Sequence, residues 1–447
     1  MIIVDTILQQ REEKGDPVKV GLIGAGNMGK MIALEFLDPA ITGMRLVAIA
    51  NRTVDKAEDA FRRAKVDSVV RADSVQALES AIARKQPVVT GDAMAICQAG
   101  NIDVVIDATG TLEFGAHIAM EAIANGKHLV LMNAELDATV GPILKVYADR
   151  QGVTYTFTDG DEPGVAMNLY RFLDLVGYKP VMMGQIKGFL NRYRNPETQA
   201  EFAKQHGQTP AIVASFADGS KLCLESNLMA NATGFRVATL GMQGPHYAHV
   251  KEMLNLYPAE RLLQGGIVDY VLNAEPFNGA FVIAYCENPG KMRSMKYLKM
   301  GDGPLYMFYT PFHLPHVQIP LSVARAALFN DATVAPKGAP VCDTVSIAKR
   351  DLKAGEVLDG VGGFTCYGLL DNYDNAHAAD ALPIVVSEGC RLKRDIAIDK
   401  PITYADVELP AGRLCDELRI KQNEHFGIAP QKAATAERGR KVELEVS

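Results

Sequence analysis

The segment Val18-Lys-Val-Gly-Leu-Ile-Gly-Ala-Gly-Asn-Met-Gly29 decides the fold. A short apolar run ends in three glycines spaced as G-x-G-x-x-G and continues directly into a stretch of helical periodicity, which is the strand–turn–helix context of a dinucleotide-binding fingerprint. In such a turn the first glycine permits the sharp bend, the second lets a pyrophosphate approach the backbone, and the third lets the helix pack close to the strand. The start of the helix offers N–H groups to the phosphates. The expected cofactor contacts here are Gly24, Gly26, Asn27, Met28 and Gly29.

A second strand-like run, Leu46-Val-Ala-Ile-Ala50, ends at Asn51-Arg52-Thr53. NAD enzymes usually carry an Asp or Glu at this place, where it binds the 2′-hydroxyl of the ribose. Here no carboxylate would repel a 2′-phosphate, and Arg52 can stack on adenine and pair with that phosphate. We therefore predict NADP(H) as the cofactor, with Asn51 and Arg52 at the ribose. The alternative is that Arg52 is an ordinary solvated loop residue.

The composition bounds the class of protein. The chain has 447 residues, 48% of them hydrophobic and 22% charged, and a net charge of −7. It has no long basic run, so no nucleic-acid partner is expected. No apolar stretch reaches the roughly 18–20 residues of a membrane span, so no membrane association is expected either. The N-terminal segment carries charges in the wrong place for a signal peptide and predicts an amphipathic helix.

Seven cysteines are spread along the chain without a C-x-x-C pair. This odd, scattered set favours reduced thiols, and hence a cytoplasmic location, over disulfides or a zinc site. We expect all seven to be buried as small apolar residues.

Residues 1–160 alternate between strand-like and helical segments, which predicts an α/β fold with a Rossmann-type, doubly wound parallel sheet that binds NADP. The expected strands are 18–23, 45–50, 87–90, 103–107, 128–132 and 153–158, and the expected helices are 29–37, 54–64, 73–84, 113–125 and 138–151. Ligands of such sheets bind at the carboxyl ends of the strands. We expect cofactor contacts there from Ala108, Thr109, Gly110, Asn133 and Glu135.

Residues 161–330 change character and predict an α+β substrate-binding, catalytic and dimerisation domain. A helix is expected from Pro163, then strands at 180–190, 277–286 and 305–309 among helices at 195–206, 221–231, 245–255 and 318–329. Residues 330–340 form a Pro- and Ala-containing connector. Residues 342–430 carry short strand signals with many glycines and predict a small β-rich domain. Residues 431–447 are polar, and we expect a flexible tail.

A cationic loop follows the expected strand 180–190, with Lys187, Asn191 and Arg192 close together in the sequence. A point charge, an amide and a planar guanidinium can converge on a phosphate or a carboxylate. The alternative is a solvated basic loop at the end of a sheet strand.

Lys221 and Glu225 are four residues apart on an expected helix and so share one face. A buried lysine beside a carboxylate can titrate near neutrality and transfer protons. An exposed ion pair is the alternative, but Leu222, Leu224 and Leu228 make the flanks of this helix apolar, so we expect it to be buried.

Two further groups could act in catalysis. His313 and His316 lie in a Pro-rich loop after Thr310, where they could bind a metal or transfer protons, and satisfied structural histidines are an equal alternative. Asp161 and Glu162 follow an expected strand, where their oxygens could hold Mg²⁺ or Mn²⁺. They could equally stabilise the start of the following helix.

The stretch Gly188-Phe-Leu-Asn191-Arg192-Tyr193-Arg194-Asn195, with the Rossmann unit and the Asp107-Ala-Thr-Gly turn, resembles the homoserine dehydrogenase superfamily. The pattern of that family is close to G-x-x-N-G-T-x-N-Y; here the Gly and the first Asn match, while Arg-Tyr replaces Gly-Thr. The family also places an Asp and a Lys four apart, whereas Asp218 and Lys221 are three apart. These departures point away from homoserine, and the inserted arginine suggests an anionic substrate, such as a sugar phosphate or a sugar acid.

Two C-terminal stretches resemble the halves of a SAF (antifreeze-like) domain: Ala348-Lys-Arg-Asp-Leu-Lys-Ala-Gly-Glu-Val-Leu, and Lys393-Arg-Asp-Ile-Ala-Ile-Asp-Lys-Pro-Ile-Thr-Tyr-Ala-Asp-Val. A core like homoserine dehydrogenase joined to such a domain is similar to the 1-deoxy-D-xylulose 5-phosphate reductoisomerase-like family. The resemblance covers nearly the whole chain.

This resemblance implies a homodimeric, NADPH-dependent and Mg²⁺- or Mn²⁺-dependent enzyme that converts 1-deoxy-D-xylulose 5-phosphate to 2-C-methyl-D-erythritol 4-phosphate, a precursor of isoprenoids. The implied catalytic residues are Lys187, Lys221, Glu225 and His313; the implied substrate contacts are Asn191, Arg192, Asp218, Asn227, Thr310 and His316; the implied metal ligands are Asp161 and Glu162. One alternative is an NADP-dependent dehydrogenase or oxidoisomerase of a branched sugar acid or a homoserine-like substrate. Another is a non-catalytic NADP-binding metabolite sensor.

Overall fold

The structure is a computed structural model that describes residues 4–430. The chain divides into two compact units. The first comprises Met1–Asp137, Leu144–Gly164 and Leu314–Ala335, and the second comprises Ala138–Ile143, Val165–His313 and Pro336–Ser447. The predicted flexible tail, 431–447, lies outside the described residues.

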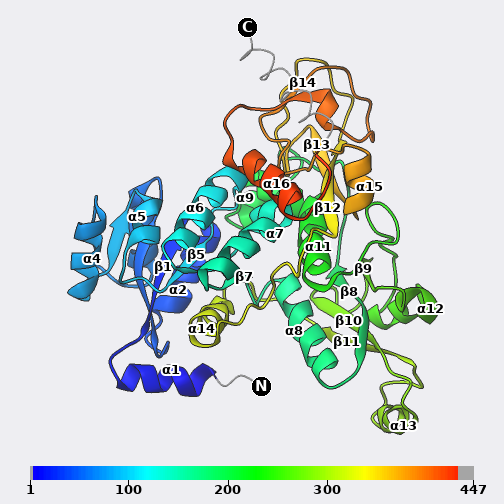
Figure 1. Ribbon diagram of the computed structural model, residues 1–447, viewed down its shortest axis with the longest axis horizontal. Coiled ribbons are helices and arrows are strands. Elements are labelled where there is room, and N and C mark those ends of the chain that lie inside the picture. Colours follow the sequence, from blue (N-terminus) through cyan, green and yellow to red (C-terminus); the bar gives the residue numbers. More distant parts are fainter. Residues whose placement is uncertain (1–3, 431–447) are drawn as a thin grey trace. The chain divides into compact units, whose positions relative to one another are not determined.

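The first unit is built on one parallel sheet, drawn in blue and cyan in Figure 1. Its strand order is β3-β4-β2-β1-β5-β6-β7, and every pair is parallel. The strand order reverses between β1 and β5, which creates the switch point where doubly wound sheets bind ligands. The predicted α/β fold class is confirmed. The strands are β1 (Val18–Ile23), β2 (Met44–Ala50), β3 (Val70–Arg71), β4 (Val88–Thr90), β5 (Val104–Asp107), β6 (His128–Leu131) and β7 (Tyr155–Phe157).

Helices cover both faces of this sheet because successive side chains of a strand point to opposite faces. Val20 and Leu22 of β1 belong to a core cluster with Ile32 of α2. Gly21 lies between them in the sequence, and a Cβ there would meet Ile96 of α5 on the other face. The helices are α1 (Val4–Glu13), α2 (Asn27–Leu37), α3 (Val54–Arg63), α4 (Val75–Ala83), α5 (Ala93–Gln98), α6 (Leu112–Ala124) and α7 (Ala134–Gln151).

One helix of this unit comes from far along the chain. Residues 318–329 are predicted as a helix of the substrate-binding segment, yet α14 (Ile319–Phe329) contacts β6, β7 and α1. Its Ile319 and Val323 are fully buried in the same core cluster as β1. The apolar face of α14 therefore completes the Rossmann-type unit.

The second unit contains a mixed sheet in the order β11-β10-β8-β9. Strand β10 is antiparallel to both neighbours, whereas β8 and β9 are parallel. The elements are α8 (Glu162–Leu175), which begins in the first unit, β8 (Lys179–Lys187), α9 (Ala200–Gln205), α10 (Pro210–Ala217), α11 (Ser220–Thr233), the 3₁₀ helix η1 (Val250–Asn255), α12 (Ala259–Leu262), β9 (Ile267–Leu272), β10 (Ala280–Tyr285), α13 (Pro289–Tyr297) and β11 (Leu305–Thr310).

The C-terminal segment packs into this second unit. It comprises β12 (Cys342–Ala348), β13 (Cys366–Asn372), α15 (Tyr373–Ala378), β14 (Arg391–Leu392), the 3₁₀ helix η2 (Tyr404–Asp406), β15 (Val407–Glu408) and α16 (Leu414–His425). Strands β12 and β13 form an antiparallel pair, and β14 pairs with β15. The predicted short strands are present, and α16 is an additional helix that the sequence analysis did not identify.

Helix α11 lies between the two sheets of this unit, since it contacts β8 and β9 on one side and β12 and β13 on the other. All of its residues except Lys221 are buried. A helix that is covered all round needs apolar or paired residues on every face. The prediction of a buried helix here is confirmed.

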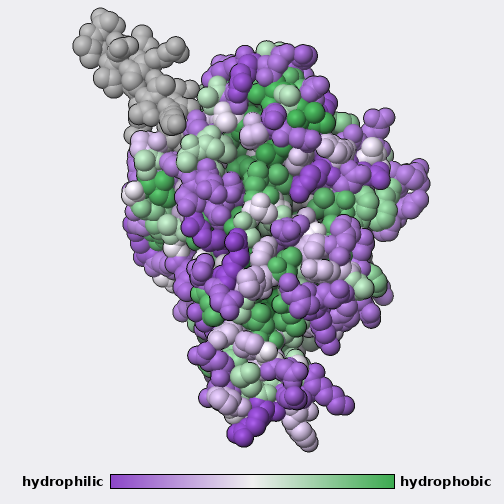
Figure 2. Space-filling model, turned by 90° about the vertical axis from the view of Figure 1, so that its right-hand side faces the viewer, coloured by the Kyte–Doolittle hydropathy of each residue, from purple (hydrophilic) through white to green (hydrophobic). Residues whose placement is uncertain are grey.

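The surface and the cysteines agree with the composition. Figure 2 shows a face on which hydrophilic residues occupy much of the area and hydrophobic residues lie between them. All seven cysteines are buried, as predicted. Among residues 4–430, no helix is both long and apolar enough to cross a membrane.

Candidate active site

The turn between β1 and α2 has the conformation that its glycines predict. Gly24 has a φ of +105°, and a Cβ there would lie 2.8 Å from the carbonyl oxygen of Ala108, in the loop after β5. A Cβ on Gly29 would lie 1.9 Å from the carbonyl oxygen of Gly24, so α2 can start this close to β1 only with glycine. Gly26 faces open space, and no side chain caps α2. The first N–H groups of α2 therefore remain for phosphates.

The residues after β2 have two different environments. Asn51 connects two loops: its Oδ1 accepts the N–H of Ala25 at 2.9 Å, and its Nδ2 donates to the carbonyl of Thr53 at 2.8 Å. Arg52 is exposed and makes no ion pair or hydrogen bond within residues 4–430. Arg52 thus has its guanidinium available for a ligand, as the predicted 2′-phosphate contact requires.

The residues after β5 are held by a buried carboxylate. Asp107 accepts the N–H of Thr109 at 2.9 Å and its hydroxyl at 2.7 Å through Oδ1, and the amide of Asn133 at 2.9 Å through Oδ2. Burial raises the pKa of Asp107, and the bonds from Thr109 and Asn133 partly oppose that shift. Asn133 also caps α7 by accepting the N–H of Leu136 at 3.1 Å.

This network separates supporting residues from accessible ones. Asp107 and Asn133 are fully buried, while Ala108 and Thr109 are half-buried, Gly110 is exposed and Glu135 is half-buried. The fixed loop conformation leaves the accessible residues at the carboxyl end of β5, the predicted cofactor edge. A direct contact between Asn133 and the cofactor stays a prediction.

The residues after β7 are anchored by Asp159, which is fully buried. Its Oδ1 accepts from the guanidinium of Arg325 at 2.8 Å, and its Oδ2 accepts from the hydroxyls of Ser322 and Thr333. Gly160 packs against the returning chain, where a Cβ would lie 2.1 Å from the carbonyl oxygen of Leu314. The turn is therefore rigid, and it fixes the direction in which the next residues leave it.

Asp161 and Glu162 follow this turn and are only 6% and 1% exposed. The N–H of Leu314 donates to the carbonyl of Gly160 at 2.8 Å, and one peptide bond links Leu314 to His313. The ligand atoms of Asp161, Glu162 and His313 lie within 4.8 Å of one another. Two carboxylates suit a hard cation such as Mg²⁺ or Mn²⁺, and an imidazole extends the choice to softer transition metals. Glu162 is also the first residue of α8, where it can stabilise the helix dipole.

The two predicted histidines have different partners. Nδ1 of His313 lies 2.8 Å from Oδ1 of Asn278. Nε2 of His316 lies 3.9 Å from Oε1 of Glu35 on α2. The contact with Asn278 orients the imidazole of His313 through its Nδ1 edge.

A lysine and a glutamate meet where β8 ends. Nζ of Lys187 lies 3.6 Å from Oε2 of Glu225, with side-chain exposures of 27% and 3%. Gln185 is fully buried two residues before Lys187, and its amide donates to the carbonyl of Leu222 at 3.1 Å and to the hydroxyl of Ser226 at 3.2 Å. Gln185 therefore fixes α11, and with it Glu225, relative to β8.

Lys221 lies one turn before Glu225 on α11 and is half-buried. Lys187 and Glu225 form an ion pair with one partly accessible member. Such a pair can accept and return a proton, which is the requirement for acid–base catalysis.

The loop after β8 is held at several points. The Oδ1 of Asn191 accepts the N–H of Tyr193 at 3.1 Å, so this amide shapes the loop while the residue itself stays exposed. The guanidinium of Arg192 lies over the ring of Tyr367, 5.5 Å from its centroid. Arg192 forms no ion pair in the part of the chain that the structure describes. The predicted convergence of Lys187, Asn191 and Arg192 on one anion stays a prediction.

Asp218 and Asn227 are fully buried. Asp218 pairs with Lys349 at 2.8 Å. The Nδ2 of Asn227 donates to the hydroxyl of Thr344 at 3.3 Å, and its Oδ1 accepts from Asn231 at 2.6 Å. The structure thus supplies a structural role for both side chains, and the substrate contacts predicted for them stay predictions. Thr310 ends β11 and is half-buried.

Sequence reasoning missed residues that act through long-range contacts. Gln185 bonds Leu222 and Ser226 of α11, and Lys349 pairs with Asp218, 131 residues away in the sequence. One signal was available: Lys349 directly follows the apolar residues Ile347 and Ala348 of β12, where a buried charge needs a partner.

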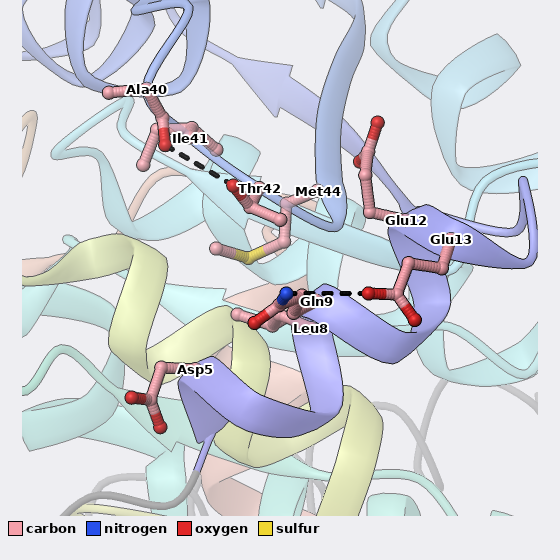
Figure 3. A pocket seen from close by; sticks show the side chains of 9 residues that line it. All are labelled: Asp5, Leu8, Gln9, Glu12, Glu13, Ala40, Ile41, Thr42 and Met44. Carbon is pink, nitrogen blue, oxygen red and sulfur yellow. Dashed lines mark hydrogen bonds between the residues drawn. The ribbon is translucent and has the colours of Figure 1, made fainter.

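A separate pocket of about 600 Å³ is lined by α1 and the segment before β2 (Figure 3). Three acidic residues, Asp5, Glu12 and Glu13, lie around it, and the amide of Gln9 donates to Glu13 at 3.3 Å. None of the predicted cofactor, substrate or metal residues lines this pocket.

Two protein-family models match the chain. Residues 24–157 match the NAD-binding domain of homoserine dehydrogenase, and residues 160–319 match the catalytic domain of oxidoreductase DRL. The first match spans the glycine-rich turn and the ends of β2, β5 and β6. The second spans Asp161, Lys187, Glu225 and His313. Neither match reaches 342–430, so the SAF resemblance stays a prediction.

Solved structures are similar only at low identity. A homoserine dehydrogenase from Thiobacillus denitrificans is 16% identical, with 76% of this chain and 83% of that chain covered and a TM-score of 0.42. A scyllo-inositol dehydrogenase from Lactobacillus casei with bound NAD(H) and scyllo-inositol is 13% identical, with 60% and 73% covered and a TM-score of 0.35. An NAD-binding oxidoreductase from Klebsiella pneumoniae is 22% identical, with 40% and 44% covered and a TM-score of 0.29.

The chain spans about half or less of the first two structures matched, 44% and 49% of their lengths. No curated protein sequence matches it. Residues 24–157 are thus similar to a NAD-binding domain, in agreement with the glycine-rich turn on the parallel sheet, and residues 160–319 are similar to the catalytic domain of an oxidoreductase.

Proposed function

We propose that the protein is an NADPH-dependent reductoisomerase that converts 1-deoxy-D-xylulose 5-phosphate to 2-C-methyl-D-erythritol 4-phosphate, in the synthesis of isoprenoid precursors. The observation that carries the proposal is the group formed by two buried carboxylates, Asp161 and Glu162, and the half-buried imidazole of His313, whose ligand atoms lie within 4.8 Å of one another. A skeletal rearrangement of a ketose requires a Lewis acid, whereas a nicotinamide enzyme can oxidise a simple alcohol without one. The match to the DRL catalytic domain over the same residues supports it.

Asp161, Glu162 and His313 would hold the cation, which fits Mg²⁺ or Mn²⁺ because two of the three ligands are carboxylates. When bound, this cation supplies a positive charge that polarises the ketose carbonyl and a neighbouring hydroxyl. The turn anchored by Asp159 holds the two carboxylates in place, so the protein needs little rearrangement to accept the ion.

Lys187, Lys221 and Glu225 are the proposed proton-transfer groups. The retro-aldol step begins when a base removes a proton from a substrate hydroxyl, and the aldol step ends when a proton returns. Glu225 accepts this proton and later returns it, and Lys187, 3.6 Å away, stabilises the Glu225 carboxylate whenever it is ionised. NADPH, when bound, supplies the hydride that reduces the rearranged aldehyde, and Arg52 binds its 2′-phosphate.

Asn191 and Arg192 are the proposed phosphate contacts, and Thr310 and His316 the proposed contacts for substrate hydroxyls. Arg192 suits this role because its guanidinium is half-buried over Tyr367 and has no carboxylate partner in residues 4–430. We also propose a cytoplasmic homodimer. Exposed apolar residues of α8, Phe172 and Leu175, support an interface, and light scattering of the purified protein tests it.

A second candidate is an NADP-dependent dehydrogenase or oxidoisomerase of a branched sugar acid or a homoserine-like substrate. The match of residues 24–157 to homoserine dehydrogenase favours it. A third, a cofactor-binding sensor without turnover, is opposed by the Lys187–Glu225 pair, which a sensor does not need.

The experiment is a substrate panel with NADPH, NADH, NADP⁺ and NAD⁺, each with Mg²⁺, with Mn²⁺ and with chelator. We expect NADPH consumption with 1-deoxy-D-xylulose 5-phosphate and Mn²⁺ or Mg²⁺, and mass and NMR spectra of the branched product. NADP⁺ reduction by sugar acids or homoserine would instead favour the second candidate. Cofactor binding without turnover on any substrate would favour the sensor.

A variant pair tests the cation site. Asp161→Asn removes one ligand charge, so the Mn²⁺ concentration for half-maximal activity should rise about tenfold or more. Asp174→Asn, on the exposed part of α8, is the matched control and should change nothing. An unchanged Mn²⁺ requirement in Asp161→Asn would remove this residue from the proposed site.

A further inference from the structure

The loop 188–199 joins β8 to α9 and carries the two proposed phosphate contacts, Asn191 and Arg192. It has no helix or strand of its own, and loops of this length move unless other elements hold them. One bond comes from nearby: the N–H of Asn191 donates to the carbonyl of Ala217 at 2.7 Å. Asn191, Asn195 and Thr198 make hydrogen bonds within the loop, and its bonds to distant segments come from the C-terminal segment.

Lys349 provides the first of these bonds. It is 5% exposed at the end of β12, and its Nζ donates to the carbonyl of Arg194 at 2.8 Å, to Oδ2 of Asp218 at 2.8 Å and to the carbonyl of Gly363 at 2.7 Å. A lysine ammonium has three N–H donors, so this one is fully used. Lys349 thereby ties the loop to the turn before α11 and to the segment before β13.

Asp399 provides the second set of bonds. Its Oδ2 accepts the hydroxyl of Tyr193 at 2.9 Å, and its Oδ1 accepts the hydroxyl of Tyr367 at 3.0 Å. Tyr367 is the ring over which Arg192 lies. Asp399 therefore holds the residue that follows Arg192 and the ring that supports it.

The hydrogen bonds of Lys349 and of Asp399 act on neighbouring residues of the loop. The Arg192 side chain points at a ring held by Asp399, and the backbone two residues later is held by Lys349. Three consecutive residues, 192–194, are thus fixed by the C-terminal segment, each by a different kind of contact. An arginine fixed before its anion arrives loses less side-chain entropy on binding than a free one.

We infer that Lys349 and Asp399 are positioning residues: through Arg194, Tyr193 and Tyr367, the C-terminal segment holds loop 188–199 so that Arg192 is presented to an anionic substrate. The inference rests on the proposed function for the identity of that substrate. The C-terminal segment, residues 342–430, would then have a role in substrate binding, although it lies outside the region that matches the catalytic domain.

Asp399→Ala is the main test, because Asp399 is exposed and its loss should not unfold the protein. Hydrogen exchange of loop 188–199 should be faster in the variant, and the KM for 1-deoxy-D-xylulose 5-phosphate should rise about threefold to tenfold, the range for the net contribution of one ordinary hydrogen bond. The KM for NADPH and the value of kcat should stay within twofold. Asp399→Asn keeps one acceptor oxygen and places an amide donor at the other position, and because a tyrosine hydroxyl can also accept, it should recover part of the loss.

Asp395→Ala is the matched control. Asp395 is an exposed carboxylate of the same C-terminal segment that pairs with Lys353 at 2.8 Å and does not contact the loop. Its removal should leave exchange of loop 188–199 and the substrate KM unchanged. Tyr193→Phe removes one of the two bonds to Asp399 and should fall between the control and Asp399→Ala.

The outcomes separate this inference from the proposed function. If Asp399→Ala leaves exchange of the loop unchanged, the inference fails whatever the substrate. If exchange rises but the substrate KM does not, the contact is structural only and the positioning role fails. If the wild-type protein turns over no sugar phosphate, the proposed function fails; inorganic phosphate then serves as the probe, and it should slow exchange of loop 188–199 in the wild type but not in Asp399→Ala. Equal slowing in both proteins would overturn the positioning role.

Discussion

Two lysine–carboxylate pairs of the second unit differ in distance and in burial. Lys349 and Asp218 are 2.8 Å apart, with side-chain exposures of 3% and 0%. Lys187 and Glu225 are 3.6 Å apart, and the lysine keeps 27% of its side-chain surface. The first pair is short, sealed from water and fully hydrogen-bonded at the lysine. The second is longer and open on one side.

The difference in burial indicates a structural role for the first pair and a role in proton transfer for the second. A buried pair whose donors are all used has nothing left for a substrate, and removing one partner leaves an uncompensated charge in the interior. A pair with one accessible member can rearrange around a ligand and transfer a proton. We therefore expect mutations at Lys187 to affect turnover and mutations at Lys349 to affect stability.

The largest effect should come from Lys187→Met, which keeps the length of the side chain and removes its charge. We expect kcat/KM for reductive isomerisation to fall by about 10²–10⁴-fold, the range of a lost acid–base group. Lys179→Met, at the exposed start of the same strand, is the control. Full activity in Lys187→Met would contradict the catalytic reading of this pair.

Lys349→Met should have its main effect on stability. It leaves Asp218 buried without its cation, and the free energy of unfolding should fall by about 3–5 kcal/mol. Urea denaturation followed by circular dichroism measures it. The double variant Lys349→Met/Asp218→Asn should recover part of the loss, because an amide oxygen can still accept the N–H of Ser220. A single variant as stable as the wild type would show that the pair is not structural.

Asp137 is a buried carboxyl that, unlike Asp218 and Glu225, has no cationic partner among residues 4–430. It is 1% exposed on α7, neither oxygen has a hydrogen-bond partner within residues 4–430, and burial raises its pKa to about 8. A pKa raised in the folded state favours folding at pH values below the unfolded pKa near 4, and this contribution is lost as the pH rises toward 8.

The free energy of unfolding should therefore fall with pH between about 4 and 8, by at most about 1.4 kcal/mol per unit from this group. The free energy of unfolding of Asp137→Asn should depend less on pH than that of the wild type. Between pH 5 and pH 7, the difference in stability between the two proteins should change by about 2–3 kcal/mol in favour of Asp137→Asn. Parallel pH profiles of the two proteins would mean that Asp137 is already ionised in the folded state.

The sequence predicted the conformation of the glycine-rich turn well because the relevant spacing is short. Gly24, Gly26 and Gly29 fall within one turn, and their roles follow from backbone sterics that any Rossmann-type unit must satisfy. The buried character of α11 was also readable, since Leu222, Leu224 and Leu228 leave no polar face around Glu225.

The sequence could not predict which polar residues meet across long distances. Asp218 and Lys349 are 131 residues apart, and Tyr193 and Asp399 are 206 apart. Neither spacing produces a periodic pattern, so the sequence does not show that Asp218 pairs with Lys349 or that Tyr193 pairs with Asp399. The placement of α14 has the same cause, because an amphipathic helix shows that it has a buried face but not which sheet covers that face.

The smallest expected effect concerns two arginines of the first unit, one with carboxylate partners and one without any in the described part of the chain. Arg71 is engaged by Asp55 at 2.8 Å and by Glu58 at 2.6 Å, whereas Arg52 is exposed and forms no ion pair among residues 4–430. Arg52→Ala should raise the KM for NADPH about threefold to tenfold, the range for one exposed charge-assisted contact, and leave the KM for NADH unchanged. Arg71→Ala, the matched control, should leave both values unchanged, because its guanidinium is already occupied. If Arg52→Ala keeps the wild-type preference between the two cofactors, Arg52 is a solvated loop residue and the 2′-phosphate must be recognised elsewhere.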